Sequence, residues 1–434
     1  MTTSGVNVRG LVLDILLEVN EKEQYSHQVI RDVLNKYQYL EKQERAFLTR
    51  LAEGTIEHML EMDFIINSFS KVKVNKMKPL IRNLLRMSVY QLKYMDAIPD
   101  AAVCNEAVKL AQKRKFGQLR GFVNGVLRSI AREMHKLQYP DEKLEPVRFL
   151  EVTYSMPTWI VEQWINAYGY TQTKEICESF LVERPITIRT NLTKITPEDL
   201  KSRLEQEGVK VKQIAFDYAF EIEGFDYLQS LESFQEGLFY VQDISSMMVA
   251  ETACPKQGDT IIDVCAAPGG KSSHLAEKMA GTGMVEARDL TEYKVSLMEE
   301  NIDRQGLQNM CAVQMDALVY DKDSEEKADI LICDLPCSGL GVMGKKTDIR
   351  YKMTEQKQKD LVQLQREMLD TVCTYVKHGG TLVYSTCTIH RGENEENVEW
   401  FLQNHAEFEL ISQKQMFPDE VCHDGFFIAK LQRK

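Results

Sequence analysis

Two cysteines and an aspartate follow short apolar runs in the second half of this 434-residue chain. Residues 328–334 have a strand pattern that ends at Asp334, and Cys337 comes three residues later. A second strand pattern, at 380–384, is soon followed by Cys387. Because the ligands of an open α/β sheet bind beyond the carboxyl ends of its strands, we expect Asp334, Cys337 and Cys387 to meet in one crevice.

These three groups suit transfer of a methyl group to C5 of cytosine, a carbon too electron-poor to attack a methyl sulfonium directly. A thiolate that adds to C6 makes the ring an enamine whose C5 is nucleophilic, and a carboxylic acid beside N3 keeps that intermediate neutral. The thiol leaves by elimination after C5 loses its proton. The spacing does not rank the two thiols, because DNA cytosine methyltransferases use the cysteine of a Pro-Cys pair, which here would be Cys337.

A tight turn between a strand and a helix predicts where the methyl donor binds. The apolar run 261–265 is followed by a proline and two glycines at 268–270, after which the composition favours a helix. A Walker A loop is excluded because Cys265 stands where its first glycine is needed, and a dinucleotide fingerprint lacks its third glycine. Asp289 lies where an acid would hold ribose hydroxyls. An acid of this kind without a dinucleotide or triphosphate loop indicates S-adenosylmethionine.

Three motifs carry a resemblance to a known family. They are Asp-Val-Cys-Ala-Ala-Pro-Gly-Gly-Lys at 263–271, Asp-Leu-Pro-Cys-Ser-Gly at 334–339, and Tyr-Ser-Thr-Cys-Thr at 384–388, which is followed by Glu-Asn-Glu at 393–395. The chain resembles, over nearly its whole length, the Sun family (also called Fmu or RsmB) of bacterial 16S ribosomal RNA cytosine-C5 methyltransferases. We therefore expect an S-adenosylmethionine-dependent enzyme that forms a covalent bond between a cysteine and C6.

The resemblance assigns roles to individual residues. It implies that Cys387 is the nucleophile, that Cys337 helps to release the methylated RNA, and that Asp334 is the third catalytic residue. The residues that it implies contact S-adenosylmethionine are Cys265, Ala266, Ala267, Pro268, Gly269, Gly270, Lys271, Asp289, Asp316 and Asp334. Two of these have simpler alternatives, since Asp316 could cap a strand end and Lys271 could be a solvated lysine at a helix start.

The expected fold is multidomain, of class α and α/β. The resemblance implies an all-helical NusB-like RNA-binding domain at 1–140, a linker with a small α+β module like an RNA-recognition motif at 141–236, and a Rossmann-like S-adenosylmethionine-dependent methyltransferase domain at 237–434. Hydrophobic periodicity agrees, because residues 6–134 have helical patterns and residues 186–191 alternate like a strand.

Finer patterns predict individual elements. Helices are expected at 41–62, at 80–94 after Pro79, and at 101–115, and residues 137–150 are expected to be a linker. A helix should begin near Thr196 and end at Gly208. A final hairpin strand is expected at 424–429.

Charge is divided unevenly along the chain. The net charge is −12, which by itself argues against nucleic acid. Residues 1–150, however, hold 24 Lys and Arg against 18 Asp and Glu, a net charge of +6. Local charge decides contacts with phosphates, so an RNA-docking surface is expected there, the alternative being a solvated helical face. Basic charge is concentrated between residues 109 and 136, where only Glu133 opposes Lys109, Lys113, Arg114, Lys115, Arg120, Arg128, Arg132 and Lys136. The loop at 345–350 departs from the family pattern and is expected to contact substrate.

The other cysteines argue against a metal site, and the hydropathy of the chain argues against a secreted or membrane protein. Packing is the expected role of Cys104, Cys177, Cys254, Cys311, Cys333, Cys373 and Cys422. No metal is expected, because the chain has no Cys-x-x-Cys pair. The absence of a signal-peptide pattern and of long apolar runs predicts a cytoplasmic protein without membrane contact. The expected partner is 16S rRNA, naked or in a partly assembled small subunit, bound by a monomer.

Two other functions compete with this interpretation. An RNA-binding, antitermination-like protein would not need the intact cofactor loop, Asp334 and Cys387. An amino-group methyltransferase places Asp or Asn, two prolines and an aromatic residue at this strand end in order to stack the base. Here no aromatic residue follows Asp334, and transfer to an amine would leave both thiols unexplained.

Overall fold

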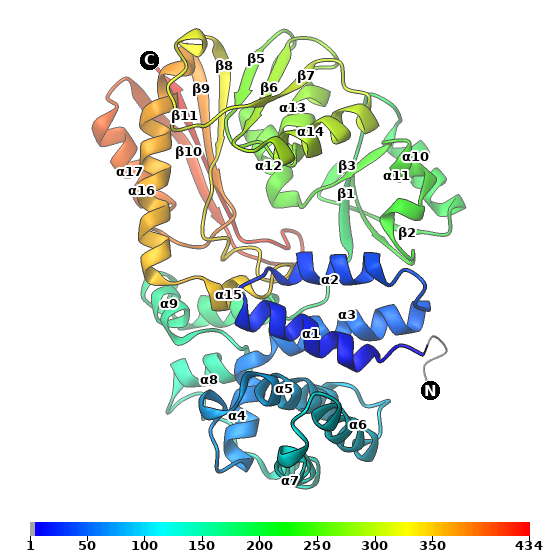
Figure 1. Ribbon diagram of the computed structural model, residues 1–434. Helices are drawn as coiled ribbons and strands as arrows, with labels where there is room; N and C mark the ends of the chain where they lie inside the picture. The colour runs from blue at the N-terminus through cyan, green and yellow to red at the C-terminus, as the bar shows by residue number, and fades with distance from the viewer. Residues whose placement is uncertain (1–4) are drawn as a thin grey trace. The chain divides into compact units, whose positions relative to one another are not determined.

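The computed structural model describes residues 5–434, which form two compact units (Figure 1). Unit 1 comprises the described residues up to Leu181 together with Lys345–Lys352, and unit 2 comprises Val182–Gly344 and Met353–Lys434. No helix in the described range is long and apolar enough to cross a bilayer.

Unit 1 is helical throughout, as the sequence predicts. The expected single helix at 41–62 is interrupted at His58, and the predicted linker at 137–150 ends inside α8. The helices of unit 1 are α1 (Val8–Glu21), α2 (Ser26–Lys36), α3 (Lys42–Glu57), α4 (Met59–Phe69), η1 (Val74–Lys76), α5 (Pro79–Tyr94), α6 (Asp100–Lys113), η2 (Gly117–Leu119), α7 (Arg120–Glu133), η3 (Met134–Lys136), α8 (Pro146–Thr153), α9 (Thr158–Ser179) and α15 (Ile349–Lys352).

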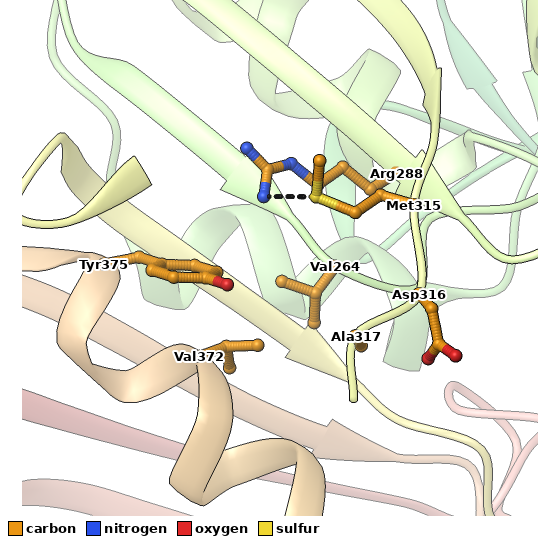
Figure 2. Close-up of a pocket in the computed structure, with 7 residues that line it drawn as sticks. All are labelled: Val264, Arg288, Met315, Asp316, Ala317, Val372 and Tyr375. Carbon is orange, nitrogen blue, oxygen red and sulfur yellow. Dashed lines mark hydrogen bonds between the residues drawn. The ribbon is translucent and has the colours of Figure 1, made fainter. Parts of the chain in front are cut away.

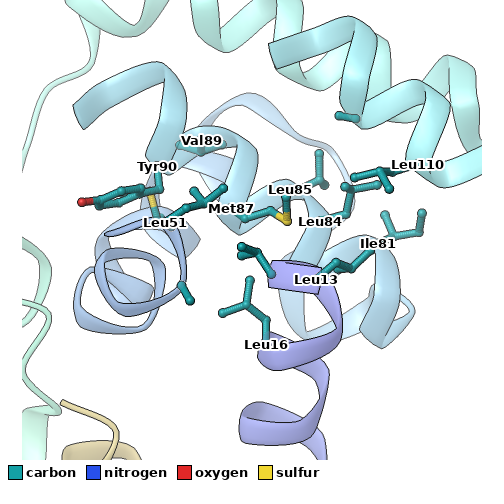
Figure 3. Packing of buried hydrophobic residues seen from close by; sticks show 14 of the residues in the cluster. Leu13, Leu16, Leu51, Ile81, Leu84, Leu85, Met87, Val89, Tyr90 and Leu110 are labelled. Atoms are coloured by element: carbon teal, nitrogen blue, oxygen red, sulfur yellow. The ribbon is translucent and has the colours of Figure 1, made fainter. Parts of the chain in front are cut away.

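The core of unit 1 is one cluster of aliphatic side chains from several helices (Figure 3). Leu13 of α1, Leu51 of α3 and Leu84 of α5 are each fully buried in it. Helices α3 and α5 approach closely at Gly54, where a β-carbon would lie only 2.1 Å from the ring of Tyr90. Burial of this apolar surface is what holds the bundle together.

Residues Lys345–Lys352 belong to unit 1, although the segments on either side of them belong to unit 2. The carboxylate of Asp348 accepts hydrogen bonds from the backbone N–H and the hydroxyl of Ser26 at 3.1 and 2.6 Å. The buried Arg350 donates to the carbonyl oxygen of Tyr154 at 3.2 Å. Asp348 and Arg350 are therefore structural, and the expectation that this segment contacts substrate is wrong for these two side chains.

Unit 2 begins with the small α+β module that was predicted. Its four-stranded sheet has the order β2-β3-β1-β4, in which all neighbours are antiparallel. The hydroxyl of Thr196 accepts from the backbone of Asp199 and so begins the helix where the sequence predicts it. The elements are β1 (Ile186–Thr190), α10 (Pro197–Gln206), β2 (Lys210–Ile214), β3 (Phe216–Glu223), η4 (Leu228–Ser230), α11 (Glu232–Gln235) and β4 (Phe239–Val241).

A seven-stranded sheet follows, with the order β10-β11-β9-β8-β5-β6-β7. Strands β9, β8, β5, β6 and β7 are parallel to one another, β11 pairs with β9 in antiparallel fashion, and β10 pairs with β11 in antiparallel fashion. The elements are α12 (Ile244–Ala253), β5 (Thr260–Asp263), α13 (Gly270–Lys278), β6 (Met284–Asp289), α14 (Glu292–Gln305), β7 (Met310–Gln314), η5 (Lys322–Ser324), β8 (Ala328–Asp334), α16 (Glu355–Val372), η6 (Cys373–Tyr375), β9 (Val376–Thr386), α17 (Glu395–Asn404), β10 (Phe408–Met416) and β11 (Phe426–Arg433).

Helices cover both faces of this sheet (Figure 1). Ile330 and Ile332 of β8 pack on the face covered by α12, α13 and α14, whereas Leu331 and Cys333 pack on the face of α16 and α17. Because both faces are buried, the strand is apolar from Ile330 to Cys333, which is the pattern of a central parallel strand. The Rossmann-like sheet is therefore confirmed.

The predicted packing role of the remaining cysteines is only partly confirmed. Cys104, Cys177, Cys333 and Cys373 are buried. Cys254 and Cys311 are exposed, so the prediction is wrong for these two. Cys254 is the left-handed residue that ends α12, and Cys311 lies on β7, the edge strand of the sheet, where one neighbouring strand is missing.

Candidate active site

The two thiols that the sequence singled out are neighbours. Cys337 follows β8 and Cys387 follows β9, and these two parallel strands pair with Asp334 opposite Ser385. Their carboxyl ends thus lie together, and the Sγ atoms of Cys337 and Cys387 are 3.3 Å apart. The two strand ends therefore converge as predicted.

Asp334 lies at the same strand end, with both carboxylate oxygens engaged. The hydroxyl of Ser385 donates to Oδ1 at 2.7 Å, and Nζ of Lys271 lies 2.7 Å from Oδ2. Lys271, the second residue of α13, is therefore an ion-pair partner of Asp334 and not a solvated lysine. Ser385 is a contact that sequence reasoning missed, although it stands two residues before Cys387 in a quoted motif.

The surroundings of Cys337 and Lys271 raise the pKa of both groups. The pKa of Cys337 is raised well above its ordinary value, mainly by the hydrogen bond with Cys387 and also by burial. This thiol therefore keeps its proton. Burial alone would lower the pKa of Lys271, but the adjacent Asp334, with Cys387 and Asp263 as further negative groups, raises it. The lysine therefore stays positively charged beside the thiol pair.

A buried carboxylate fixes the loop that carries Cys337. Glu393, which has no exposed surface, accepts at Oε2 from the backbone N–H of Ser338 at 2.8 Å and from Gln365 at 3.1 Å. Its Oε1 lies 3.0 Å from Nδ1 of His390. Since Ser338 directly follows Cys337, Glu393 holds that cysteine from its C-terminal side.

The neighbouring asparagine does the same for Cys387. Oδ1 of Asn394 accepts from the hydroxyl of Thr386 at 2.5 Å, and its Nδ2 donates to the carbonyl oxygen of Thr388 at 3.1 Å. These two threonines flank Cys387 in the sequence. The motif at 393–395 carried no role in the sequence analysis, and the structure shows what it contacts.

A backbone contact joins the two cysteine loops directly. The N–H of Gly341 donates to the carbonyl oxygen of Cys387 at 3.0 Å. A β-carbon at Gly341 would lie 1.8 Å from the carbonyl oxygen of Gly425, so only glycine fits here without displacing backbone. The spacing of the thiols is thus set by buried side chains and by close backbone contact.

Replacing Glu393 should slow turnover by misplacing Cys337. We expect Glu393→Ala to lower kcat for methyl transfer about 100-fold, the order of loss for a displacement of about 1 Å at a reacting group, with KM for the methyl donor little changed. Glu393→Gln should retain more activity, because its amide oxygen can still accept from Ser338. The matched control is Glu396→Ala at an exposed position two residues into α17. Equal activity of Glu393→Ala and the control would contradict the positioning role.

The turn between β5 and α13 folds against the acid at the end of β6. The backbone N–H of Ala267 donates to Oδ2 of Asp289 at 3.0 Å, and that of Ala266 donates to the carbonyl oxygen of Arg288 at 2.8 Å. Gly269 has a φ of +96°, which reverses the chain before α13 begins. Cys265–Lys271 and Asp289, predicted as one binding site, are therefore adjacent.

Asp316 follows β7, the strand that pairs in parallel with β6. It behaves as a local cap, because its Oδ1 accepts from the backbone N–H of Leu318 at 2.9 Å. Figure 2 shows Asp316 at the margin of a small pocket, its carboxylate directed away from Arg288 and Tyr375. The capping alternative is thus part of its role, and its second carboxylate oxygen remains available to a ligand.

These groups fit a nucleoside. Asp289 and Asp316 end adjacent strands, and the apolar Leu290 and Leu318 beside them are 55 % and 40 % exposed. Carboxylates accept hydrogen bonds from ribose hydroxyls or amino groups, and aliphatic side chains contact the faces of a base. The donor set therefore fits the nucleoside part of S-adenosylmethionine.

Comparison with protein families gives three matches along the chain. Residues 250–432 match the model of the 16S rRNA methyltransferase RsmB/F, and residues 6–132 match the NusB family. Residues 156–225 match the ferredoxin-like domain of RsmF/B-like methyltransferases. The three segments fall in the helical domain, the small module and the large sheet, although α8 and β4 lie outside them.

Whole-length relatives agree with these models. The chain is 37 % identical to the probable ribosomal RNA small subunit methyltransferase B of Bacillus subtilis (strain 168), over 99 % of both chains. It is 30 % identical to ribosomal RNA small subunit methyltransferase B of Escherichia coli O1:K1, again over 99 % of both chains.

Solved structures show the same fold. A crystal structure of the protein PH0851 aligns over 99 % of both chains with a TM-score of 0.83 and 27 % identity. A methyltransferase homologue from Pyrococcus horikoshii aligns over 66 % of this chain and 98 % of its own, with a TM-score of 0.59 and 28 % identity.

Proposed function

Because this chain belongs to the RsmB/F family of 16S rRNA methyltransferases, we propose that it methylates C5 of one cytosine in 16S rRNA through a covalent bond between Cys387 and C6. The observation that carries the proposal is the pair of thiols 3.3 Å apart beside Asp334. Transfer to an amino group needs no thiol, so it leaves this arrangement without a purpose.

S-adenosylmethionine supplies an electrophilic methyl group when it is bound. Asp289 and Asp316 would hold its nucleoside, and the turn Cys265–Lys271 would contact its amino-acid part. In this arrangement Lys271 forms an ion pair with the catalytic carboxylate of Asp334. From the sequence alone, Lys271 could be either a solvated lysine or a contact of the cofactor.

The first step is addition of Cys387 to the cytosine ring. The Cys387 sulfur forms a bond to C6 with its own electron pair, the C5–C6 π bond breaks, and the electrons shift through C4 onto N3. N3 takes a proton from the Asp334–Lys271 pair, whose ammonium group is within 2.7 Å of the carboxylate. The positive charge of Lys271 near Cys387 also favours the thiolate that this step requires.

After C5 has gained the methyl group, the ring must be released. The C5 proton passes to solvent, its electron pair restores the C5–C6 double bond, and the bond between Cys387 and C6 breaks. N3 returns its proton to the Asp334–Lys271 pair. The retained proton of Cys337 can form a hydrogen bond with the departing sulfur, which stabilises the thiolate as it leaves.

The basic stretch of the NusB-like domain supports a role in docking RNA. Lys113, Lys115 and Arg120 are exposed at the end of α6 and the start of α7, where they can contact phosphates. Arg114 contributes less, because it pairs with Asp14 at 2.6 Å and donates to the carbonyl oxygen of Gly10.

The test is bisulfite sequencing of 16S rRNA from cells with and without this gene. Loss of the gene should remove protection at one cytosine, and the wild-type gene should restore it. Cys387→Ala should not restore it, whereas the exposed and remote Cys311→Ala should. Unchanged protection in the 16S rRNA of cells that lack the gene would contradict the proposed substrate.

A further inference from the structure

Three side chains with metal-binding atoms meet on the α16 and α17 side of the large sheet. Cys373 begins η6, His405 directly follows α17, and Glu407 directly precedes β10. One ligand atom from each lies within 4.8 Å of the other two. Sγ of Cys373 is 3.7 Å from Nδ1 of His405, which is 3.5 Å from Oε1 of Glu407.

The imidazole is held in the orientation that a metal ligand needs. Nε2 of His405 lies 2.8 Å from Oδ1 of Asp370, and the ring stacks on Phe401 with centroids 4.4 Å apart. A carboxylate can only accept, so the hydrogen bond places the ring proton on Nε2 and leaves the lone pair of Nδ1 facing Cys373 and Glu407. A carboxylate that orients histidine in this way is the usual outer partner of a metal-bound imidazole.

The distances fit one metal in particular. Zinc binds sulfur at about 2.3 Å and nitrogen or oxygen at about 2.0–2.2 Å in tetrahedral geometry, so its ligands are about 3.4–3.6 Å from one another. The two separations around Nδ1, 3.7 Å to Cys373 and 3.5 Å to Glu407, are close to this range. Thiolate, imidazole and carboxylate together are donors typical of zinc and unsuited to magnesium or calcium.

We propose that Cys373, His405 and Glu407 bind a zinc ion, with water as the fourth ligand. On binding, the Cys373 thiol gives its proton to solvent and forms a bond from Sγ to the metal, and no oxidation or reduction occurs. The side chain of Glu407 is 45 % exposed, which gives the ion and the water access. The sequence has no Cys-x-x-Cys pair and so predicts no metal, whereas Cys373 and His405 are 32 residues apart.

The site would be structural. Cys373 precedes β9 and Cys387 follows it, and a strand of eleven residues separates its ends by on the order of 30 Å. The ion is therefore far from the methyl-transfer chemistry. It would add a second connection between the end of α16 and the turn between α17 and β10, which the contact of His405 with Asp370 already joins.

The test is titration of the full-length, chelator-treated protein with Co²⁺ and then Zn²⁺. The catalytic thiols could also bind a soft metal, so the titration uses the Cys337→Ser/Cys387→Ser background. We expect one equivalent of Co²⁺ to give a sulfur-to-metal charge-transfer band and the intense visible bands of a tetrahedral site, which Zn²⁺ then removes. Zn²⁺ should also raise the melting temperature.

Variants in that background assign the ligands. Cys373→Ser should remove the charge-transfer band, and Glu407→Gln, at a half-exposed position where folding is not at risk, should weaken binding. Asp370→Asn should lower affinity about 10- to 100-fold. The control is His378→Ala, an exposed histidine outside the cluster. Absence of the tetrahedral spectrum in the background protein, or its persistence in both Cys373→Ser and Glu407→Gln, would overturn the proposal.

Discussion

Cys387→Ala should abolish methyl transfer, with a loss of about 10⁵-fold or more, the order found when a nucleophile is removed from an enzyme. The reason is chemical, because without addition at C6 the C5 carbon does not become nucleophilic. The environment agrees, since the positively charged Lys271 interacts electrostatically with Cys387 and so favours its thiolate.

The measurement is transfer of a labelled methyl group to 16S rRNA by the purified variant, with binding of the methyl donor measured by calorimetry. Binding should be little changed, because Cys387 follows β9, whereas most of the residues expected to bind the cofactor lie after β5, at the end of β6 or after β7. Cys311→Ala, at an exposed position on β7, should behave as wild type. Turnover within a hundred-fold of wild type in Cys387→Ala would reject this residue as the nucleophile.

The location of the site could be predicted from the sequence because it depends on strand ends. Apolar runs that end in Asp334 or shortly before Cys387 mark parallel strands, and parallel strands carry their following loops to the same edge. The same logic places Asp289 beside the turn at 265–271. None of this requires knowledge of the loops themselves.

The residues that set the geometry could not be predicted in this way. Glu393 reaches Ser338 across 55 positions, and Asp348 reaches Ser26 across 322. Such contacts depend on how loops cross in three dimensions, which periodicity does not report. The same is true of Cys373 and His405, whose 32-residue separation resembles no metal-binding signature. Alternation along a strand gives only the face of a side chain, not its partner.

The exposure of individual cysteines could not be predicted from the sequence either. A cysteine is usually buried, but Cys311 lies on an edge strand and Cys254 occupies a left-handed position at a helix end. Strand order and cap geometry decide both cases, and neither is encoded by a short window of sequence. The prediction that a cysteine is buried was therefore wrong at these two positions, where the strand order or the helix end exposes the side chain.

Cys337→Ala should trap the enzyme on its RNA. In the proposed mechanism the Cys387 sulfur leaves C6. Cys337 lies 3.3 Å from that sulfur, and its raised pKa keeps it a hydrogen-bond donor. Without this donor the departing thiolate is less stabilised, so addition and methylation should proceed while elimination slows. We therefore expect a covalent protein–RNA adduct that survives denaturing electrophoresis and carries the methyl label.

The double variant Cys337→Ala/Cys387→Ala is the decisive control, because it should form no adduct if the trapped bond is the one between Cys387 and C6. Cys337→Ser should accumulate less adduct than Cys337→Ala, since a hydroxyl can still donate a hydrogen bond. The opposite pattern, in which Cys387→Ala forms the adduct and Cys337→Ala is inert, would exchange the roles of the two thiols. Normal turnover of Cys337→Ala without any adduct would instead reduce Cys337 to a packing residue, and the proximity of the thiols would then serve only to position Cys387.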